Sequence, residues 1–597
     1  MATMRGADII AEYLVKEKVP YIFGLCGHGI IGFLDALYDR QDKIKAMTVR
    51  HEQAAGHMAD AYFRVAHKPV ATFTSCGPGS TNLPTAVASA MMDSSAFLAI
   101  TGNVPTSQFN RSPFQETGRY YQAEYANVLR PYVKRSFQPA RVDMIPLAIR
   151  QAFKTMLTGR TGPVHIDIPL NCFAEEADVE VPEPGLWRGG ISSRGAGSPE
   201  LVEKALDLLL STDKPCIVAG HGAVLSEAAP ELRRLAELLK VPVATTANGK
   251  GIIPEDHPLS LGAIGRNGTY MANEACRSCD VLLGLGVKFD DRQSSSWIPG
   301  YTFNIPPTKL IHVEIDPDEL GRNYPPTLGI LADARDFLRE VLKRAETTVK
   351  RDEGRNRTWL DEIERWRKGW EEFNRPNFTS EVVPVRPERL VKDVRAVMPR
   401  DGILLSDVGE HHNWVIQFYE AYEPGTMLQS WGFASMGFGV CGVLGAKLAA
   451  PDRVCVSVCG DGGFMMTPHI LCTAVEYDIP AVWIVWNNYG WNVIRLQANG
   501  AWPGREIVTS FRRDDTGEFC SPDFAALAKA CGANGARVEK PGDFKDVFQH
   551  AIKSNAPFVI DVIVERDAKA PSVGTWVLPP FPHPEPSYGK RNLRGGC

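Results

Sequence analysis

The sequence has no apolar run approaching the roughly 18 residues that a membrane-spanning helix requires. Its N-terminus, MATMRGADIIAEYLVKEKVP, lacks the apolar core of a signal peptide and is typical of an amphipathic helix. No charge of one sign dominates, because 65 basic and 70 acidic residues are mixed along the chain. We therefore expect a cytoplasmic protein that binds neither nucleic acid nor a membrane.

The cysteines show no disulfide or zinc pattern. They are 13 in number, scattered and mostly within apolar stretches, which indicates reduced thiols. Cys276 and Cys279 form one C-x-x-C pair, but no second pair follows at zinc spacing. We interpret the pair as a coincidence within a helix.

The chain is too long for one hydrophobic core, and domains of about 100–200 residues predict three or four units. Short apolar stretches alternate with helix-length segments, which predicts α/β domains with open, mainly parallel sheets. A Gly- and Ser-rich linker (184–198) and a charged helix with spaced tryptophans (351–373) separate the segments. The predicted units are 1–185, 199–350, 384–565 and a Pro- and Gly-rich tail, 566–597.

One βαβ unit carries the strongest signal in the sequence. Apolar runs at 454–459 and 481–486 flank one helix length, so parallel strands are expected. The first run leads into GDGG, from Gly460 to Gly463, and the second into NNYG, from Asn487 to Gly490. Because the carboxyl ends of parallel strands meet at one sheet edge, a carboxylate, a carboxamide and free backbone N–H groups come together there. Such a set suits a Mg²⁺ ion that holds a diphosphate.

This pair of motifs resembles that of thiamine diphosphate (ThDP) enzymes, with the second asparagine 27 positions after the aspartate (488 − 461). The resemblance implies that Asp461, Asn488 and the carbonyl oxygen of Gly490 ligate Mg²⁺. It also implies a cofactor-binding role for three neighbouring glycines: Gly460, Gly462 and Gly463.

Two further stretches of the third domain resemble acetolactate synthase-like ThDP enzymes. DVGEHHNWVIQF (407–418) is similar to D-V-G-x-H-x-x-W-x-x-Q-F, and WGFASMGFG (431–439) is similar to G-G-L-G-A-M-G-F-G. In that family the methionine, here Met436, bends the cofactor into a V. The other cofactor-binding residues that the resemblance implies are Gly409, Glu410, His411 and Ala434.

The first domain resembles the pyrimidine-binding domain of the same family. VRHEQAAGHMADAY surrounds Glu52, whose counterpart contacts N1′ of the aminopyrimidine. FQET resembles F-Q-E-x-D, whose glutamine, here Gln115, lines the cofactor pocket, and Gly118 stands where an acid is common. In this family the two domains of one site come from different subunits. The resemblance therefore predicts a homodimer or homotetramer.

A competing motif lies in the same domain. GHGIIG, from Gly27 to Gly32, fits the G-x-G-x-x-G of dinucleotide-binding enzymes, with Glu52 20 residues beyond it. A nucleotide-binding dehydrogenase would leave Asp461, Asn488 and Glu52 unexplained as a set, so we favour the ThDP interpretation.

The middle segment, with DVLLGLGVKFDDR, resembles the middle domain of acetolactate synthases, where the neighbourhood of FDDR (Phe289–Arg292) helps to hold FAD. In relatives that act on acyl-CoA this domain holds ADP or part of CoA, and in others it holds nothing. A structural Asp-Asp-Arg salt bridge accounts for FDDR equally well.

The tail is either disordered or a lid, and its basic residues, Lys590, Arg591 and Arg594, could close over a phosphate-bearing substrate.

Three positions depart from acetolactate synthases. His28 replaces a glycine, and the sequence Gly-His-Gly after a strand resembles that of enzymes that open cyclic 1,2-diones. The alternative is a histidine that merely stacks at the end of a strand. Asn492 and Arg495 follow the metal loop on a helix that often faces substrate, and Gln497 stands where a tryptophan selects the second 2-oxo acid. We predict a lyase or carboligase acting on a 2-oxo acid or related small molecule, with 2-hydroxyacyl-CoA lyase and cyclic 1,2-dione hydrolase as alternatives. The expected catalytic residues are Glu52, His28, Gln115 and Asn492.

Overall fold

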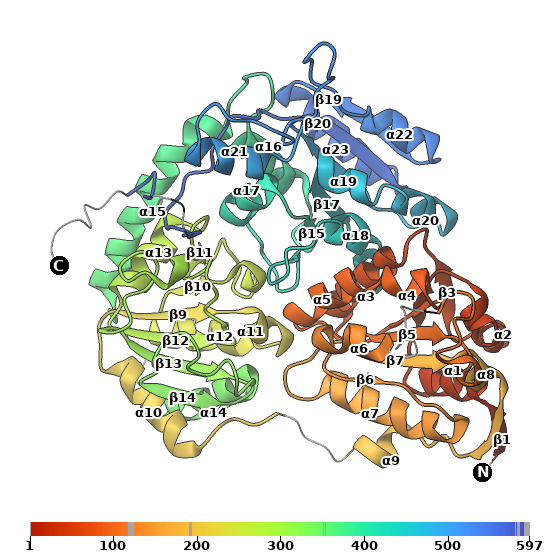
Figure 1. Cartoon of the computed structure of the whole chain (residues 1–597). Coiled ribbons are helices and arrows are strands. Elements are labelled where there is room, and N and C mark those ends of the chain that lie inside the picture. The colour runs from red at the N-terminus through yellow and green to blue at the C-terminus, as the bar shows by residue number, and fades with distance from the viewer. Residues whose placement is uncertain are drawn as a thin grey trace.

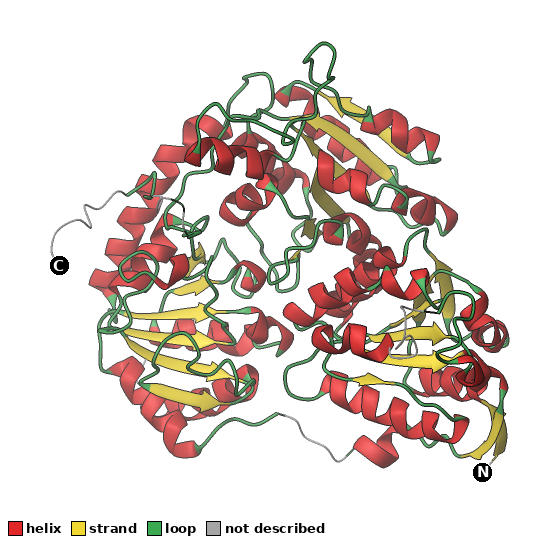
Figure 2. Cartoon of the chain, viewed as in Figure 1, coloured by secondary structure: helices red, strands yellow, loops and turns green. Residues whose placement is uncertain are grey.

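The computed structural model describes residues 2–116, 125–189, 194–349, 352, 354–579, 581 and 585–589. Within them the chain forms three six-stranded sheets, and every strand pairing inside these sheets is parallel. Helices flank each sheet (Figures 1 and 2). The predicted α/β architecture of three parallel-sheet domains is thus confirmed.

The first and third sheets have the same strand order. The first runs β3 (Lys45–Thr48), β2 (Tyr21–Gly24), β4 (Ala71–Thr74), β5 (Leu98–Asn103), β7 (Val164–Pro169), β6 (Ser136–Phe137). The third runs β16 (Met427–Gln429), β15 (Ile403–Ser406), β17 (Cys455–Gly460), β18 (Val482–Asn487), β20 (Phe558–Ile563), β19 (Asn534–Val538). Numbered by position in the chain, both orders are 2-1-3-4-6-5. The two end domains therefore share one topology without a recognisable sequence repeat.

The middle sheet has the order 3-2-1-4-5-6, which is typical of doubly wound nucleotide-binding folds. Its strands are β11 (Ser260–Ala263), β10 (Val243–Thr245), β9 (Pro215–Ala219), β12 (Val281–Leu285), β13 (Lys309–Glu314) and β14 (Leu328–Leu331). All five residues of β12, VLLGL, are buried, because helices cover both faces of a parallel sheet. A separate antiparallel ribbon pairs β1 (Ala2–Arg5) with β8 (Glu176–Val179).

The helices follow the three domains in order. The first domain contains α1 (Gly6–Lys16), α2 (Ile31–Tyr38), α3 (Glu52–Ala66), α4 (Pro78–Thr81), α5 (Pro84–Met92), α6 (Tyr125–Leu129), α7 (Ile145–Leu157), α8 (Leu170–Ala174) and α9 (Pro184–Arg188). The middle domain contains α10 (Pro199–Leu210), α11 (His221–Leu225), α12 (Ala229–Leu239), α13 (Tyr270–Ser278) and α14 (Ala334–Thr348). After α15 (Arg357–Phe378), the third contains α16 (Pro387–Val397), α17 (Glu410–Phe418), α18 (Phe438–Ala449), α19 (Asp461–Met466), α20 (Ile470–Glu476), α21 (Asn492–Ala501), α22 (Phe524–Ala530) and α23 (Phe544–Lys553). None of the helices in the described ranges is both long and apolar enough to cross a bilayer.

Some elements differ in extent from the prediction. Strands β17 and β18 each lie one residue further along than expected, because Gly460 still pairs with Trp486 in the ladder. The tryptophan helix continues five residues beyond Phe373, with Pro376 inside its last turn. The predicted linker begins with the helical turn α9, and its residues 190–193 lie outside the described ranges. Cys276 lies buried in α13, and Cys279 is the residue that caps the helix. Among the described residues no group of three or more His, Cys, Asp or Glu side chains could hold a metal ion.

The first and third domains pack through helices α3 and α18 (Figure 1). A Cβ atom on Gly445 of α18 would lie 2.0 Å from the carbonyl oxygen of Met58 on α3, so only glycine permits this approach. The small residues after Glu52, Ala54 to Gly56, are buried in the same helix. This packing sets the position of the first domain relative to the third within one chain.

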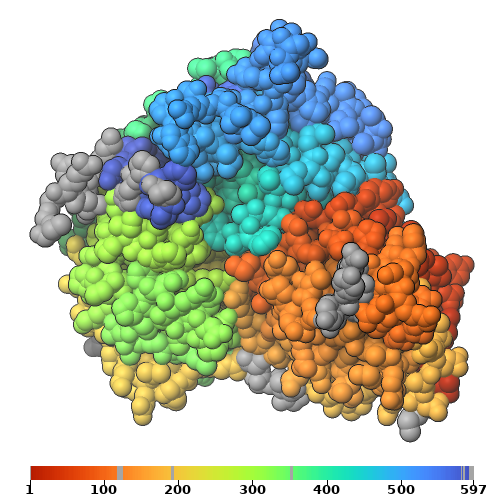
Figure 3. Space-filling model, in the orientation of Figure 1, coloured from red at the N-terminus to blue at the C-terminus, as the bar shows by residue number. Residues whose placement is uncertain are grey.

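The described part of the tail has no helix or strand and lies between the middle and third domains (dark blue in Figure 3). The indole N–H of Trp576 donates to Asp291, and the Tyr588 ring lies 5.0 Å from that of Trp370 on α15. This part is therefore packed rather than disordered. The basic residues of the proposed lid, Lys590, Arg591 and Arg594, lie outside the described residues.

Candidate active site

The ends of β17 and β18 meet as the sequence predicts. Asp461, the first residue of α19, is 1% exposed and accepts hydrogen bonds from the backbone N–H of Gly462 at 2.8 Å and of Gly490 at 3.1 Å. Burial raises the pKa of Asp461 to about 6, since its charged form is desolvated. A cation beside this carboxylate would offset that cost. The site therefore fits a metal ion chemically.

Asn488 completes this edge with a fixed orientation. Its Nδ2 donates to Oε2 of Glu410 at 3.3 Å, which leaves the carboxamide oxygen as the ligand atom. The Gly490 carbonyl oxygen accepts one bond from the Asn492 N–H at 2.9 Å and keeps a second lone pair. Three oxygen atoms of the kind that Mg²⁺ prefers thus lie on adjacent strand ends.

Glu410 is a buried acid at the same sheet edge. It is 7% exposed, and burial raises its pKa to about 7. Its Oε1 has no hydrogen-bond partner among the described residues, and such orphan atoms are rare in folded proteins. A bound polar group would satisfy this atom.

Two glycines of the edge are required by close neighbours. A Cβ atom on Gly462 would lie 2.3 Å from the Trp491 ring, and one on Gly463 would lie 2.6 Å from Oδ2 of Asp407. Gly460 caps α19 and faces the His411 ring, which also covers Gly409. These glycines leave backbone N–H groups at a helix start where an anion is stabilised.

Asp407 organises the loop that carries Met436. Its Oδ1 accepts hydrogen bonds from the N–H groups of Gly437 at 2.9 Å and Gly439 at 3.1 Å. The backbone carbonyl of Asp407 accepts from Nε2 of His411 at 2.8 Å, and burial lowers the pKa of that histidine to about 4 and keeps it neutral. Within the loop Ala434 is exposed in a left-handed conformation (φ 55°), which is uncommon for a residue with a Cβ atom.

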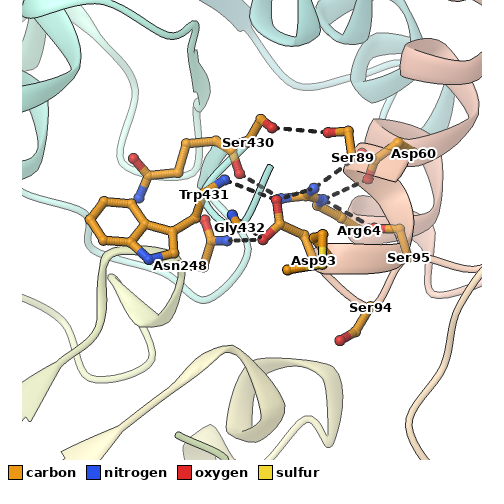
Figure 4. Close-up of polar contacts among 12 residues, drawn as sticks. Asp60, Arg64, Ser89, Asp93, Ser94, Ser95, Asn248, Ser430, Trp431 and Gly432 are labelled. Carbon is orange, nitrogen blue, oxygen red and sulfur yellow. Dashed lines mark hydrogen bonds and ion pairs between the residues drawn. The ribbon is translucent and has the colours of Figure 1, made fainter. Parts of the chain in front are cut away.

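The other end of this loop is held by the first domain of the same chain (Figure 4). Asp93 accepts hydrogen bonds from the N–H groups of Trp431 at 2.9 Å and Gly432 at 3.0 Å. Arg64, fully buried, pairs with Asp60 at 2.7 Å and with Asp93 at 3.2 Å. Three more residues join the junction, with Asn248 arriving from the middle domain: Ser89, Ser430 and Asn248.

Sequence reasoning missed Arg64, Asp60 and Asp93. A usable signal was present, because an acid and an arginine four residues apart interrupt the otherwise small and apolar face of α3. Asp407 belongs to the DVGEHHNWVIQF motif, but the motif by itself does not indicate its hold on the Met436 loop.

Glu52 begins helix α3 and is 4% exposed. Its Oε2 accepts a hydrogen bond from Nδ2 of Asn82 at 3.0 Å. The next residue, Gln53, donates to the carbonyl oxygen of Met436 at 3.4 Å. Glu52 and Asp461 are not in contact with one another within the described residues of one chain. Their hydrogen bonds stay within their own domains.

His28 and Gln115 are brought together through Cys76. Nε2 of His28 lies 3.6 Å from the Cys76 sulfur, which lies 3.9 Å from Oε1 of Gln115. The His28 ring also contacts that of Phe114, with centroids 5.5 Å apart. Gly118 of the same loop lies outside the described residues.

Asn492 lies against Glu410 rather than open to solvent. It is 4% exposed, and its Nδ2 donates to Oε2 of Glu410 and to the carbonyl oxygen of Arg566. Its Oδ1 accepts from Nε of Arg495 at 2.6 Å. The same helix carries Gln497, which is half-buried. In this chain Asn492 therefore holds Glu410, and its role towards a substrate stays a prediction.

The FDDR loop forms no Asp-Asp-Arg salt bridge in the described chain, which corrects that alternative. Arg292 donates to Asn413 at 2.9 Å and stacks on the Trp431 ring, while Asp290 accepts from the Trp431 indole N–H at 2.7 Å. Beside the loop lies a cavity of about 670 Å³. Its lining includes His221 and Gly222 at the end of β9 and Gly286 at the end of β12.

Comparisons with known proteins identify the family of the chain. Three family models match in order: "Thiamine pyrophosphate enzyme, N-terminal TPP binding domain" at residues 4–123, the "central domain" at 202–341 and the "C-terminal TPP binding domain" at 407–562. The fold and the two motif-bearing domains thus define a ThDP-dependent enzyme.

Relatives along the whole chain narrow the class further. The sequence is 36% identical to the probable acetolactate synthase large subunit of Methanocaldococcus jannaschii, over 96% of this chain and 93% of that protein. It is 33% identical to the acetolactate synthase large subunit of Haemophilus influenzae, over 95% of each. It is 29% identical to the acetolactate synthase isozyme 3 large subunit of Escherichia coli, over 95% of this chain and 96% of that protein. The chain belongs to the acetolactate synthase-like family of ThDP-dependent enzymes.

Proposed function

We propose that this enzyme is a Mg²⁺-dependent lyase or carboligase that acts on a 2-oxo acid or a related carbonyl compound. The observation that carries the proposal is the buried carboxylate of Asp461, bound to the Gly490 N–H across two strand ends and flanked by the oriented carboxamide of Asn488. A single carboxylate with amide and carbonyl oxygens suits Mg²⁺ that retains phosphate ligands.

When bound, ThDP would supply a nucleophilic carbon for addition to a carbonyl group and an electron sink for cleavage of the adjacent C–C bond. The residues of this chain orient the reaction. Asp461, Asn488 and the Gly490 carbonyl would hold the metal, and the N–H groups at the start of α19 would bind phosphate oxygens. Glu52 would hold a proton at N1′ of the pyrimidine, and Met436 would fill the space beneath the bend.

We further propose that two copies of the chain form each site. Both halves of the site carry exposed apolar side chains, which is typical of a surface that a partner covers. Beside His28 these are Ile31 (62% exposed) and Phe114 (78%), and beside Asp461 they are Met465 (42%) and Met466 (49%). A homodimer or homotetramer would place Glu52 of one subunit opposite Asp461 of another.

For the middle domain we propose an adenine nucleotide, either FAD or the ADP part of CoA. The support is the position of the cavity at the ends of β9 and β12, where the strand order of the sheet reverses. Ligands of doubly wound sheets bind at this point. A yellow protein with flavin absorbance would support FAD, and a colourless protein that CoA protects against heat would support CoA. A protein that shows neither effect would contradict the proposal.

The reaction is tested with a panel of pyruvate, glyoxylate, a 2-hydroxyacyl-CoA and cyclohexane-1,2-dione, each with ThDP and Mg²⁺. Efficient formation of acetolactate from pyruvate would assign to this chain the reaction for which its relatives are named. It would also show that Gln497 is compatible with that reaction. A second candidate, hydrolysis of a cyclic 1,2-dione, is favoured by the polar contact of His28, Cys76 and Gln115. Turnover of none of the four compounds would contradict the proposed substrate class.

For the location of the protein, the support comes from the cysteines. The described cysteines are all free, which agrees with a reducing compartment, and we propose the cytoplasm.

A further inference from the structure

The turn that carries His28 (residues 27–29) packs closely against the turn that follows β4. A Cβ atom on Gly27 would lie 2.4 Å from Oγ of Ser75, and one on Gly29 would lie 2.8 Å from the Cys76 sulfur. The Gly29 N–H donates to Oγ of Ser75 at 3.2 Å. The two glycines beside His28 are therefore required by contact with Ser75 and Cys76, and the histidine has one fixed neighbour at its Nε2 atom.

That neighbour is a buried thiol with three polar neighbours, of which the Ser75 hydroxyl, with Oγ 4.0 Å from the sulfur, can itself donate. Cys76 is 1% exposed, with its sulfur 3.6 Å from Nε2 of His28 and 3.9 Å from Oε1 of Gln115. Burial raises the pKa of the Cys76 thiol, so the group keeps its proton. A thiol has one proton to donate, and a carboxamide oxygen can only accept. If the thiol proton is directed to Gln115, Nε2 of His28 must be the donor to sulfur.

We propose that Cys76 is a positioning residue that holds His28 as the tautomer protonated at Nε2 and leaves Nδ1 to accept a proton from the substrate. No hydrogen bond occupies Nδ1 among the described residues, which exclude 117–124. The inference rests on the proposed function, because it concerns the proton that moves when the substrate carbonyl reacts.

The first test is spectroscopic and needs no turnover. Long-range ¹H–¹⁵N correlation spectra of the full chain labelled in histidine report which ring nitrogen carries the proton, and the His28 signals are identified by their loss in His28→Asn. We expect a single Nε2–H tautomer in the wild type and in Cys76→Ser, and a mixture in Cys76→Ala. An unchanged tautomer in Cys76→Ala would overturn the proposal.

The second test is a double-mutant cycle on whichever panel compound is turned over. A lost hydrogen bond predicts that Cys76→Ala lowers kcat/KM by about tenfold, with most of the loss in kcat. The same substitution should cost less than about twofold in the His28→Asn background, because its effect passes through His28. Cys76→Ser should recover most of the activity. An equal loss in both backgrounds would show a structural role for the thiol and overturn the proposal.

A matched control is available in the same domain. Cys172 is also fully buried, and its sulfur contacts only the carbonyl oxygen of Pro139 at 3.9 Å among the hydrogen bonds of the described chain. Cys172→Ala should leave both the His28 tautomer and kcat/KM unchanged. If the wild type turns over none of the panel, the proposed substrate class fails while the spectra still decide the role of Cys76.

Discussion

The backbone N–H of Gly490 donates a hydrogen bond to Oδ2 of Asp461 at 3.1 Å, so the loop after β18 is tied to the loop after β17 through a buried carboxylate. Both strands are central in the third sheet. This hydrogen bond therefore fixes the position of the loop that carries Asn488 and Gly490 relative to the loop that carries Asp461.

Replacement of Asp461 by alanine should lower the affinity for ThDP in the presence of Mg²⁺ by more than about 100-fold, since even indirect supports of metal ligands are worth about 10–100-fold. Isothermal titration calorimetry measures this. The control is Asp452→Ala, because Asp452 is an exposed acid just before β17, the strand that leads into Asp461. This variant should bind ThDP normally. Undiminished affinity in Asp461→Ala would refute the assignment.

Glu52→Gln should bind ThDP but exchange the C2 proton of the cofactor much more slowly than the wild type. Glutamine keeps the shape of Glu52 and its contact with Asn82, but it cannot share a proton with the pyrimidine. Proton exchange followed by NMR in deuterated buffer gives the rate. A rate equal to that of the wild type would rule out this role.

Mixing the two inactive variants tests whether the sites form between subunits. If Glu52 acts on the partner's cofactor, a hybrid of Glu52→Gln with Asp461→Ala has one site with both defects and one intact site. Random exchange of subunits should then restore about one quarter of wild-type activity. No recovery, despite hybrids detected by mass spectrometry, would place both residues in one chain's site.

Arg64→Ala should destabilise the protein strongly, because it leaves the buried carboxylates of Asp60 and Asp93 unpaired. Loss of one partner of a buried pair costs about 3–5 kcal/mol, and we expect the melting temperature to fall by at least about 5 °C. Calorimetry provides the measurement. Arg400→Ala removes an exposed ion pair with Asp256 and should change the melting temperature by only about 1–2 °C, because exposed pairs are worth about 0–1 kcal/mol.

Arg64→Ala also tests whether Asp93 anchors the loop that carries Met436. Since Asp93 binds the N–H groups of Trp431 and Gly432, a displaced Asp93 should also weaken ThDP binding at a temperature where Arg64→Ala is still folded. Normal affinity in that folded variant would show that the junction supports stability alone.

Strand ends and their chemistry could be predicted from the sequence. Short apolar runs that stop at GDGG and NNYG specify buried parallel strands followed by ligand-bearing loops, because burial and turn formation are encoded by residues close together in the chain. For the same reason the sequence alone is enough to place Asp461, Asn488 and Gly490 on one sheet edge.

Contacts between residues far apart in the sequence were decided only by the tertiary structure. The pairing of Arg64 with Asp93, the hold of Asp93 on the Met436 loop and the contact of Cys76 with both His28 and Gln115 join residues far apart in the sequence. Each depends on how closely packed elements approach one another, as at Gly445 against Met58, and no local pattern of apolar and polar residues specifies that distance. The motifs thus follow from local chemistry, and the supports that hold them follow from packing.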